Sequence, residues 1–481
     1  MAMERLSAQD RILLWPDDFG WPQDIGALAI LDGTRLVDPD GRVRIEAVRE
    51  AVERHLHLVP RFRQLLYSPR RGLGWPLWVD APAVDLTDHV QVFPLAASGD
   101  EAQLFLAVEH LRRRGLDRSR PLWEMWFLPG LAGGRVALFL KVHHTITDGV
   151  AGVALLGAFL DREADAPTPP APAWTPARMP PGRDVFEDNV RRRIQAAGNA
   201  LSKFAHPIDS SRQVRRGWLS VRDTFAEARA PRTSLNRRIG SGRRLAIIRS
   251  RLDVAKEIAH AHHVKLNDVF MAAVSGGLRD LLRGRGERVE DVVLRAFVPV
   301  SLHQEEPGPA RGNREGVMIV PLPIGVLDPV RRLQLIAADT VERKKEVFRP
   351  PAGMVARNRV IQRAMIRQYA RQRLANTYLT NIPGPPMPLY LAGAPLLEML
   401  PIVPLTGNVT LGVGALSYAG QFNVAAVADR DGCPDVDVFA EGMRNALRAL
   451  ASSVPAKPTA LGPDEAALGR TARGQTPTTP S

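Results

Sequence analysis

The chain has 481 residues, enough for two domains that each bury a hydrophobic core. Hydrophobic residues make up 45% and charged residues 24%, an ordinary globular balance, and the single cysteine, Cys433, excludes an intrachain disulfide. The 64 Lys and Arg residues outnumber the 51 Asp and Glu residues, which gives a formal charge of +13. This charge suits nucleic acid, an anionic membrane surface or a phosphate-bearing substrate, and composition leaves all three open.

The sequence predicts no membrane-spanning segment, because no run approaches the roughly 18 consecutive apolar residues that a spanning helix needs. The N-terminal stretch MAMERLSAQDRILLW lacks the basic start and apolar core of a secretory signal. We therefore expect a cytoplasmic protein, either soluble or peripheral to the inner face of the membrane or to lipid droplets.

The first 160 residues alternate strand-like and helix-like segments. Residues 25–31 and 136–142 are apolar runs that predict strands, and residues 44–60 have the 3.6-residue period of an amphipathic helix. Residues 150–160 are apolar on nearly every side, which predicts a buried helix. The prolines of residues 161–184 disfavour both a helix and a central strand and predict a linker.

A second alternating region follows a basic crossover linker at residues 185–231. It begins at residues 243–252 and predicts strands at residues 291–302 and 317–327, followed by a long Arg-rich helix at residues 355–373. Residues 456–481 are rich in Pro, Thr, Gly and Ala, which predicts disorder. The expected architecture is an α/β (α+β) protein with two similar halves, residues 1–184 and 232–455.

The segment FLKVHHTITDGVAG, residues 139–152, is the strongest candidate for chemistry. Strand side chains alternate between faces, so His144 is expected to end the apolar face and His143 to lie on the opposite one. An imidazole that ends an apolar face costs desolvation free energy unless it has a role. Asp148 and Gly149 then turn the chain, at a place where loops present side chains to a cleft. We infer that one histidine is a general base, since the reference pKa of about 6.5 suits that role, and that the other supports it.

The simplest alternative is that both histidines are hydrogen-bonded core residues, because a His-x-x-x-Asp spacing is common by chance. The chain has no G-x-S-x-G elbow, no glycine-rich phosphate loop and no identifiable histidine partner for Cys433. A candidate general base in a chain with no recognisable nucleophilic side chain indicates direct attack by a hydroxyl or amine of a bound substrate.

The chain resembles the bacterial wax ester synthase/diacylglycerol acyltransferase family, whose active-site signature is HHxxxDG. The resemblance extends from Leu6 to about Phe439, and the other motifs follow in the family's order: RPLWEMW, LNDVF, VPVSLH, GNREG, LTNIPGP and LSYAGQFNVAAVADRD. It implies two chloramphenicol-acetyltransferase-like domains with an active-site tunnel between them. It also implies transfer of a long-chain acyl group from acyl-CoA to diacylglycerol or a fatty alcohol, with no metal, no other cofactor and no acyl-enzyme.

The resemblance also implies roles for the residues of the motif. His144 is the expected general base and His143 its supporting neighbour. Asp148 is expected to hold the loop through a salt bridge, with Arg295 as a candidate partner, and Gly149 to leave room for substrate. His303 stands where the resemblance leads us to expect an arginine, so substrate handling is expected to differ if that position contributes to the contact between domains or to binding of the CoA phosphates.

The remaining motifs supply seven candidate substrate-binding residues: Pro121, Leu122, Trp123, Asn267, Asp268, Thr380 and Asn381. The PLW motif has core packing as its alternative role. Asn267 begins a predicted helix, so N-capping competes with a role as hydrogen-bond donor near the thioester carbonyl. The TNIPGP segment is a rigid turn first and a channel lining second.

Residues 355–373 carry six arginines and no acidic residue, and this basic segment has two interpretations. It predicts either a surface helix packed on the second half or a basic amphipathic segment on an anionic membrane or lipid droplet. Nucleic acid is the weaker partner, because these arginines lack interleaved aromatic residues. The HAHH stretch at residues 260–263 has no further ligands at zinc-like spacing. A related acyltransferase with another donor or acceptor and a non-catalytic lipid-binding protein remain alternatives.

Overall fold

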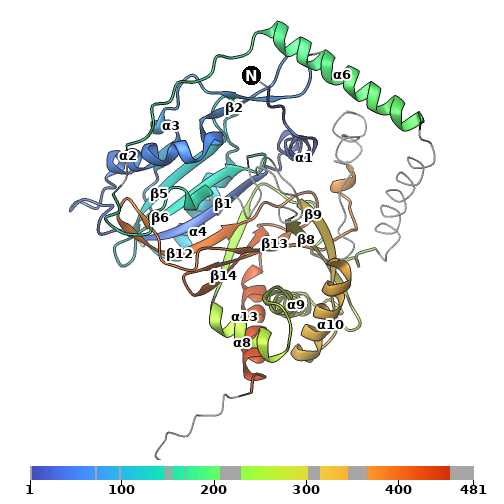
Figure 1. Ribbon diagram of the computed structural model, residues 1–481. Helices are drawn as coiled ribbons and strands as arrows, with labels where there is room; N and C mark the ends of the chain where they lie inside the picture. The colour runs from blue at the N-terminus through green and yellow to red at the C-terminus, as the bar shows by residue number, and fades with distance from the viewer. Residues whose placement is uncertain are drawn as a thin grey trace, which may run out of the picture.

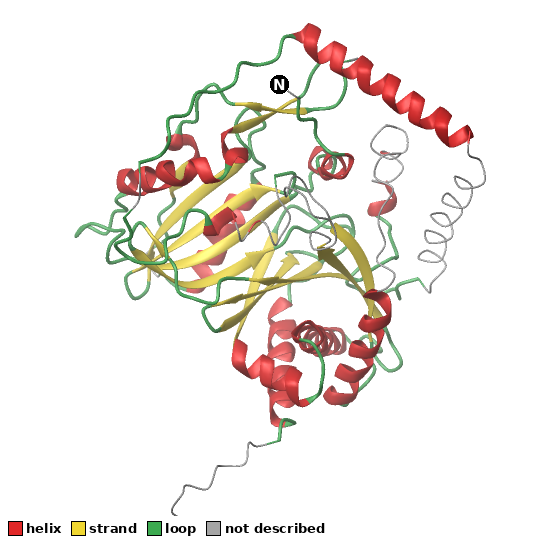
Figure 2. Ribbon diagram, viewed as in Figure 1, coloured by secondary structure: helices red, strands yellow, loops and turns green. Residues whose placement is uncertain are grey.

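The computed structural model describes residues 3–70, 73–96, 99–146, 152, 155–167, 170–205, 229–301, 315–344, 362 and 367–455. Within these ranges the chain forms two six-stranded sheets and a small two-stranded one, with helices packed outside the two large sheets (Figure 1 and Figure 2).

The first sheet contains strands from both ends of the chain, in the order β11-β12-β1-β6-β5-β4. These are β1 (Asp24–Asp32), β4 (Val90–Val92), β5 (Trp123–Leu131), β6 (Arg135–His143), β11 (Tyr390–Leu391) and β12 (Ala394–Ile402). β1 is central, because it pairs antiparallel with β6 on one side and with β12 on the other. The predicted strands at residues 25–31 and 136–142 are thus confirmed, and the second half of the chain completes the sheet of the first.

The second sheet has the order β7-β14-β13-β10-β8-β9. Its strands are β7 (Arg243–Arg251), β8 (Leu294–Ser301), β9 (Glu315–Leu322), β10 (Thr377–Pro383), β13 (Leu411–Tyr418) and β14 (Gln421–Asp429). β10 runs parallel to both neighbours, β13 and β8, and the other pairings are antiparallel. The two strands predicted for this half, at residues 291–302 and 317–327, are confirmed as β8 and β9.

Most of the helices lie on the outer faces of the two large sheets. The helix predicted at residues 44–60 is confirmed as α2 (Ile45–His55), continued by the 3-10 turns η2 (Leu56–Leu58) and η3 (Pro60–Arg63). The second sheet is covered by α8 (Leu252–Ala261), α9 (Leu266–Gly284), α10 (Pro329–Arg343) and α13 (Val436–Ser452). The remaining elements are α1 (Ala8–Leu13), η1 (Asp17–Phe19), β2 (Gln64–Tyr67), β3 (Leu77–Asp80), α3 (Leu86–His89), α4 (Glu101–Arg113) and α6 (Gly182–Ala205).

A shared core joins the two sheets. The alternation along β6 sends Leu138 and Leu140 into the core under α2, whereas Phe139 packs on the other side. That other side also holds residues of α4 and of β7 and β14, including Ile247 and Val427. The inner face of the first sheet therefore packs on the second sheet, and each large side chain buried there contributes about 1.5–3 kcal/mol.

Some expectations lie wholly or partly outside the described residues. These are the loop with Asp148 and Gly149, the position of His303, the tail 456–481 and most of residues 355–373. Of the helix predicted at residues 150–160, residues 155–157 are helical, and Leu156, Phe159 and Leu160 are buried. Among the helices of the described ranges, none is both long enough and apolar enough to cross a membrane.

Candidate active site

The end of β6 places the two histidines in different structural positions. The strand ends at His143, because Ile146 N–H donates to the His143 carbonyl (2.9 Å) and closes a turn. His144 lies half-buried in that turn, and its backbone N–H donates to the Gln23 carbonyl (2.9 Å). The strand therefore ends one residue earlier than predicted: His144 is the first residue after it, in the turn, although its backbone N–H still bonds to the residue before β1.

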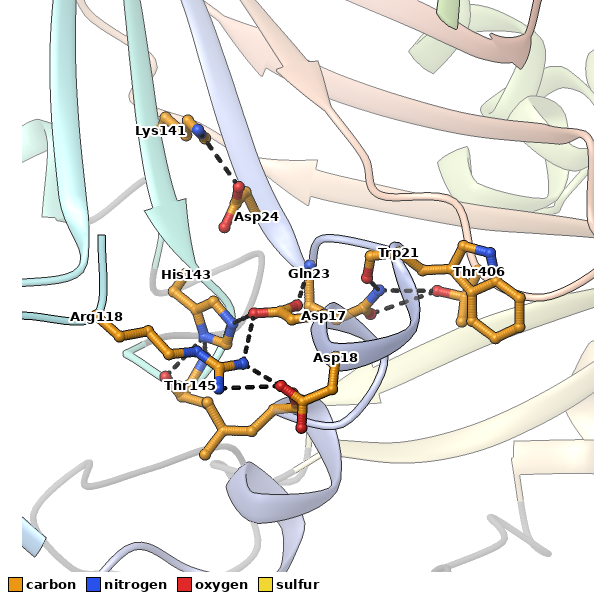
Figure 3. A network of polar contacts seen from close by, with 11 residues as sticks. Asp17, Asp18, Trp21, Gln23, Asp24, Arg118, Lys141, His143, Thr145 and Thr406 are labelled. Carbon is orange, nitrogen blue, oxygen red and sulfur yellow. Dashed lines mark hydrogen bonds and ion pairs between the residues drawn. The ribbon is translucent and has the colours of Figure 1, made fainter. Parts of the chain in front are cut away.

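The ring of His143 is buried and held at both nitrogens. Its Nε2 lies 2.8 Å from Asp17 Oδ2, and its Nδ1 lies 2.8 Å from Thr145 Oγ1 and accepts the Thr145 backbone N–H at 3.1 Å (Figure 3). A backbone amide can only donate, so Nδ1 must supply a lone pair. A neutral ring then carries its proton on Nε2 and donates it to Asp17.

Asp17 is the acceptor for three donors from separate parts of the chain. Its Oδ1 accepts the backbone N–H of Gln23 (2.8 Å), and its Oδ2 accepts from both His143 and Arg118, the latter at 3.2 Å. Burial opposes ionisation of this carboxyl, but the hydrogen bond from His143, with the Gln23 and Arg118 contacts, holds its pKa below the ordinary value. Asp17 is therefore a carboxylate at neutral pH.

Gln23 connects this end of the first sheet to the second half of the chain. Its side-chain amide donates to the Trp21 carbonyl (2.9 Å) and to Thr406 Oγ1 (3.1 Å), in the loop between β12 and β13 (Figure 3). Since the Gln23 carbonyl also holds the backbone of His144, the turn carrying His144 is tied to both halves.

The PLW motif contacts the end of β6. All three of its side chains are buried, and the Leu122 carbonyl accepts the backbone N–H of His143 (3.0 Å). Trp123 is stacked between Phe62 (4.6 Å between ring centres) and His89 (4.4 Å), and its indole N–H donates to the Phe62 carbonyl (3.0 Å). These contacts are those of core packing, and a direct contact of the motif with substrate stays a prediction.

A buried ion pair involves Lys141, which precedes His143 by two residues in β6. Lys141, 1% exposed, is 3.5 Å from Asp24 Oδ2 and donates to the Leu111 and Arg114 carbonyls near the end of α4. Burial raises the pKa of Asp24 despite the nearby charge of Lys141. The pair anchors α4 to the sheet beside the histidines.

At the start of α9, the residue that caps the helix differs from the prediction. Lys265 is the N-cap residue, and the Asp268 carboxylate accepts its backbone N–H (2.9 Å) and the Thr340 hydroxyl (2.8 Å). Asn267 is the second residue of the helix and half-buried, so its expected N-cap role is wrong. Its role as a hydrogen-bond donor to substrate stays a prediction.

Thr380 and Asn381 lie in strand β10 rather than in a turn, which begins only after Pro383. They pair with Gly414 and Ala415 of β13 and are half-buried. Arg295, the candidate partner of Asp148, is in β8 and nearly buried. Asp148 itself is outside the described residues, so that salt bridge stays a prediction.

No metal centre emerges among the described residues, where no three or more His, Cys, Asp or Glu side chains gather to hold an ion. Within the HAHH stretch, His262 Nε2 instead contacts Ser453 Oγ (2.8 Å).

Asp17, Gln23, Arg118 and Thr145 are parts of the site that sequence reasoning missed. Thr145 lies inside the histidine motif, where a hydroxyl two residues after a histidine is a usable signal. Asp17 is 126 residues from His143, and no spacing rule links the two.

Comparison with known proteins covers nearly the whole chain. The family model of the wax ester synthase/diacylglycerol acyltransferase catalytic domain matches residues 6–270, and that of the WS/DGAT C-terminal domain matches residues 311–451. A Mycobacterium tuberculosis protein that carries the name of a diacylglycerol O-acyltransferase is 30% identical over 474 residues, which cover 93% of this chain and 90% of that protein.

Solved structures of two kinds share the fold. The wax ester synthase/diacylglycerol acyltransferase from Marinobacter aquaeolei VT8 has a TM-score of 0.65 at 23% identity, over 94% of this chain and 99% of that chain. A mutant of the starter condensation domain of rhizomide synthetase, in complex with C8-CoA and Leu-SNAC, has a TM-score of 0.59 at 15% identity, over 94% and 95%. These likenesses confirm the predicted fold class of two chloramphenicol-acetyltransferase-like halves.

Proposed function

Because the chain belongs to the wax ester synthase/diacylglycerol acyltransferase family and is therefore an O-acyltransferase, we propose that it moves a long-chain acyl group from acyl-CoA to a lipid hydroxyl. The acceptor is diacylglycerol, a fatty alcohol or both. The first acceptor gives triacylglycerol and CoA, and the second gives a wax ester and CoA.

His144 is the proposed general base, and the observation that carries this choice is the environment of His143. A base needs a ring nitrogen with an available lone pair within reach of the proton that it removes. In His143 the Nδ1 lone pair is taken by Thr145, Nε2 faces Asp17, and the ring is 2% exposed. His144, in the half-buried turn next to it, is the better candidate.

The proposed reaction needs no covalent enzyme intermediate. His144 takes the proton of the acceptor hydroxyl as its oxygen attacks the thioester carbonyl carbon, and a C–O bond forms. The tetrahedral oxyanion is stabilised by hydrogen-bond donors, with Asn267 as our candidate. The C–S bond then breaks, the CoA thiolate leaves, and protonated His144 returns the proton to its sulfur. All atoms and charges balance without a metal or redox group.

The test measures release of the CoA thiol from palmitoyl-CoA with diacylglycerol or hexadecanol, for wild type and His144→Ala. The only cysteine, Cys433, is buried, and burial raises its pKa to about 11, so a thiol reagent reports CoA with little background. Loss of the base is expected to lower turnover by roughly 10²–10⁴-fold. A folded His144→Ala variant with wild-type turnover would remove His144 from this role.

The same assay separates the alternative functions. Activity with acyl groups on a carrier protein, or with an amine acceptor, would point to a related acyltransferase of the same fold. Lipid binding without thiol release from any donor would indicate a non-catalytic lipid-binding protein.

Peripheral contact with an anionic membrane or lipid droplet is part of the proposal, and α6 offers a described surface for it. One side of α6 binds the N-terminal segment: Arg5 donates to Asp188 (2.6 Å) and to the Val185 carbonyl (3.0 Å). Phe186, Val190 and Ile194, spaced four residues apart, form a stripe on another side. They are 52%, 36% and 67% exposed, and Arg183, Arg191 and Arg193 of the same helix are also exposed. Figure 1 shows α6 at the periphery of the molecule.

An apolar stripe beside arginines favours a lipid surface with negative headgroups. Co-sedimentation with vesicles that contain anionic phospholipid is expected to weaken by at least about tenfold in Phe186→Ser/Ile194→Ser, because two large apolar side chains no longer enter the lipid. Leu327→Ser is the matched control, since Leu327 is 73% exposed elsewhere on the molecule. Equal binding of all three proteins would exclude α6 as the contact.

A further inference from the structure

Asp17 reaches the backbone of His144 by two independent routes. In the first, Asp17 Oδ2 accepts from His143 Nε2, and the other nitrogen of that ring accepts the backbone N–H of Thr145, directly after His144. In the second, Asp17 Oδ1 accepts the backbone N–H of Gln23, whose carbonyl accepts the backbone N–H of His144. The Asp17 carboxylate thus contacts both His143 and Gln23 (Figure 3), and through them it holds the backbone at His144 and at Thr145.

The chemistry of these contacts requires a carboxylate. Both oxygens must accept at once, because the Gln23 amide is a permanent donor and Nε2 carries the His143 proton in the neutral ring. The depressed pKa of Asp17 keeps it in the form with two acceptors. An amide in the same place would turn its NH2 group toward one of the two donors.

We propose that Asp17 is a positioning residue of the acyl transfer, which sets the place of His144 through His143 and Gln23. This inference rests on the proposed role of His144 as general base. A base displaced by about 1 Å is expected to lose on the order of 10²-fold in rate, so a carboxylate that touches only its supports still controls turnover.

Asp17→Asn is the decisive variant and Asp18→Asn its matched control. Asp18 carries the same charge and also binds Arg118 (3.2 Å), but its side chain is 60% exposed and it lies on neither route. We expect Asp17→Asn to lower kcat by roughly 10²-fold with the KM for acyl-CoA unchanged. Asp18→Asn is expected to keep wild-type kcat. Unchanged kcat in Asp17→Asn, or an equal loss in both variants, would overturn the proposal.

A double-mutant cycle tests whether Asp17 acts through His144. In a His144→Ala background there is no base left to position, so Asp17→Asn is expected to cause no further loss of kcat. A full additional loss would mean that Asp17 acts by another path, for example through general stability. Melting curves of all variants, compared with wild type, separate that outcome from failure to fold.

A second readout does not depend on activity and separates this inference from the proposed function. Selective 15N labelling of the 11 histidine rings, with His143 assigned from a His143→Gln variant, reports which ring nitrogen carries the proton. We expect Nε2–H for His143 in wild type, and displaced His144 ring signals in Asp17→Asn but not in Asp18→Asn. An Nδ1–H ring, or unchanged His144 signals, would sink the proposal even if acyl transfer is confirmed. Displaced signals in a protein without transferase activity would instead mean that only the proposed function fails.

Discussion

Removal of the charge on Lys141 is the sharpest test of how the sheet is held beside the histidines. In Lys141→Met the buried Asp24 loses its nearest cation, 3.5 Å away, and the carbonyls at the end of α4 lose a donor. At an effective dielectric constant of about 20, a pair at this distance is worth about 5 kcal/mol. Breaking a buried pair by deletion of one partner typically costs about 3–5 kcal/mol, so we expect a loss of that size at pH 7.

The pH dependence of this loss has a definite sign. Burial already raises the pKa of Asp24, and without Lys141 it rises further. A carboxyl whose pKa is higher in the folded state than in the unfolded one destabilises the fold when ionised, and this penalty disappears as the pH falls and the group is protonated. The loss in the free energy of unfolding of Lys141→Met is therefore expected to be smaller at mildly acidic pH. The double variant Lys141→Met/Asp24→Asn is expected to recover part of that loss.

Urea unfolding followed by tryptophan fluorescence, at neutral and mildly acidic pH, measures both effects. Two results contradict the reasoning: a loss below about 1 kcal/mol at pH 7, the value of an exposed pair, or a deficit that does not change with pH.

Three further predictions concern side-chain packing and the ionisation of Asp17. Trp123→Ala removes a fully buried ring stacked between two others and is expected to cost about 3–5 kcal/mol in urea unfolding, whereas a loss under 1 kcal/mol would mean that the PLW motif is not a packing unit. In Gly414→Val, a Cβ would lie 3.0 Å from Val403 and 3.1 Å from Pro401, so we expect a loss of about 1–3 kcal/mol, with Gly115→Val, which meets open space, as an unaffected control. Asp17 has a depressed pKa, so its contribution to stability is complete above the ordinary carboxyl pKa of 3.8 and disappears as the pH falls through its lower folded value. The stability difference between wild type and Asp17→Asn is therefore expected to stay constant from pH 7 to pH 5 and to shrink only in stronger acid, and a difference that already disappears at pH 5 would contradict the ionised assignment.

The pattern of apolar residues along short segments was sufficient to predict several strands and one helix. β1 and β6 follow from apolar runs, and α2 follows from a 3.6-residue period. The cap of α9 was misjudged because Lys265 is an unusual N-cap residue, and its backbone N–H is satisfied by a carboxylate three residues later. The statistical preference of a residue type for the N-cap position does not show which side chain accepts the backbone N–H of the N-cap residue in one particular helix.

The parts that the sequence did not reveal are contacts between distant segments. The histidine motif predicted both histidines as candidates, but the contacts that distinguish the ring of His143 come from Asp17 and from the backbone of Thr145. Nothing in an apolar run states which sheet a strand joins, so the pairing of β12 with β1 was equally hidden. Such contacts are decided by the free energy of the whole packed structure rather than by any segment.

The pairing of β1 with β12 also constrains how the chain folds during synthesis. When the first half leaves the ribosome, one edge of β1 has no partner, because β12 is made only after most of the second half. At roughly 5–20 residues per second the delay is on the order of tens of seconds. During that time the nascent first half exposes an apolar strand edge that is open to intermolecular pairing. Truncation before residue 394 would make this transient state permanent, so the N-terminal half expressed alone is expected to aggregate, and co-expression of residues 232–455 is expected to restore solubility.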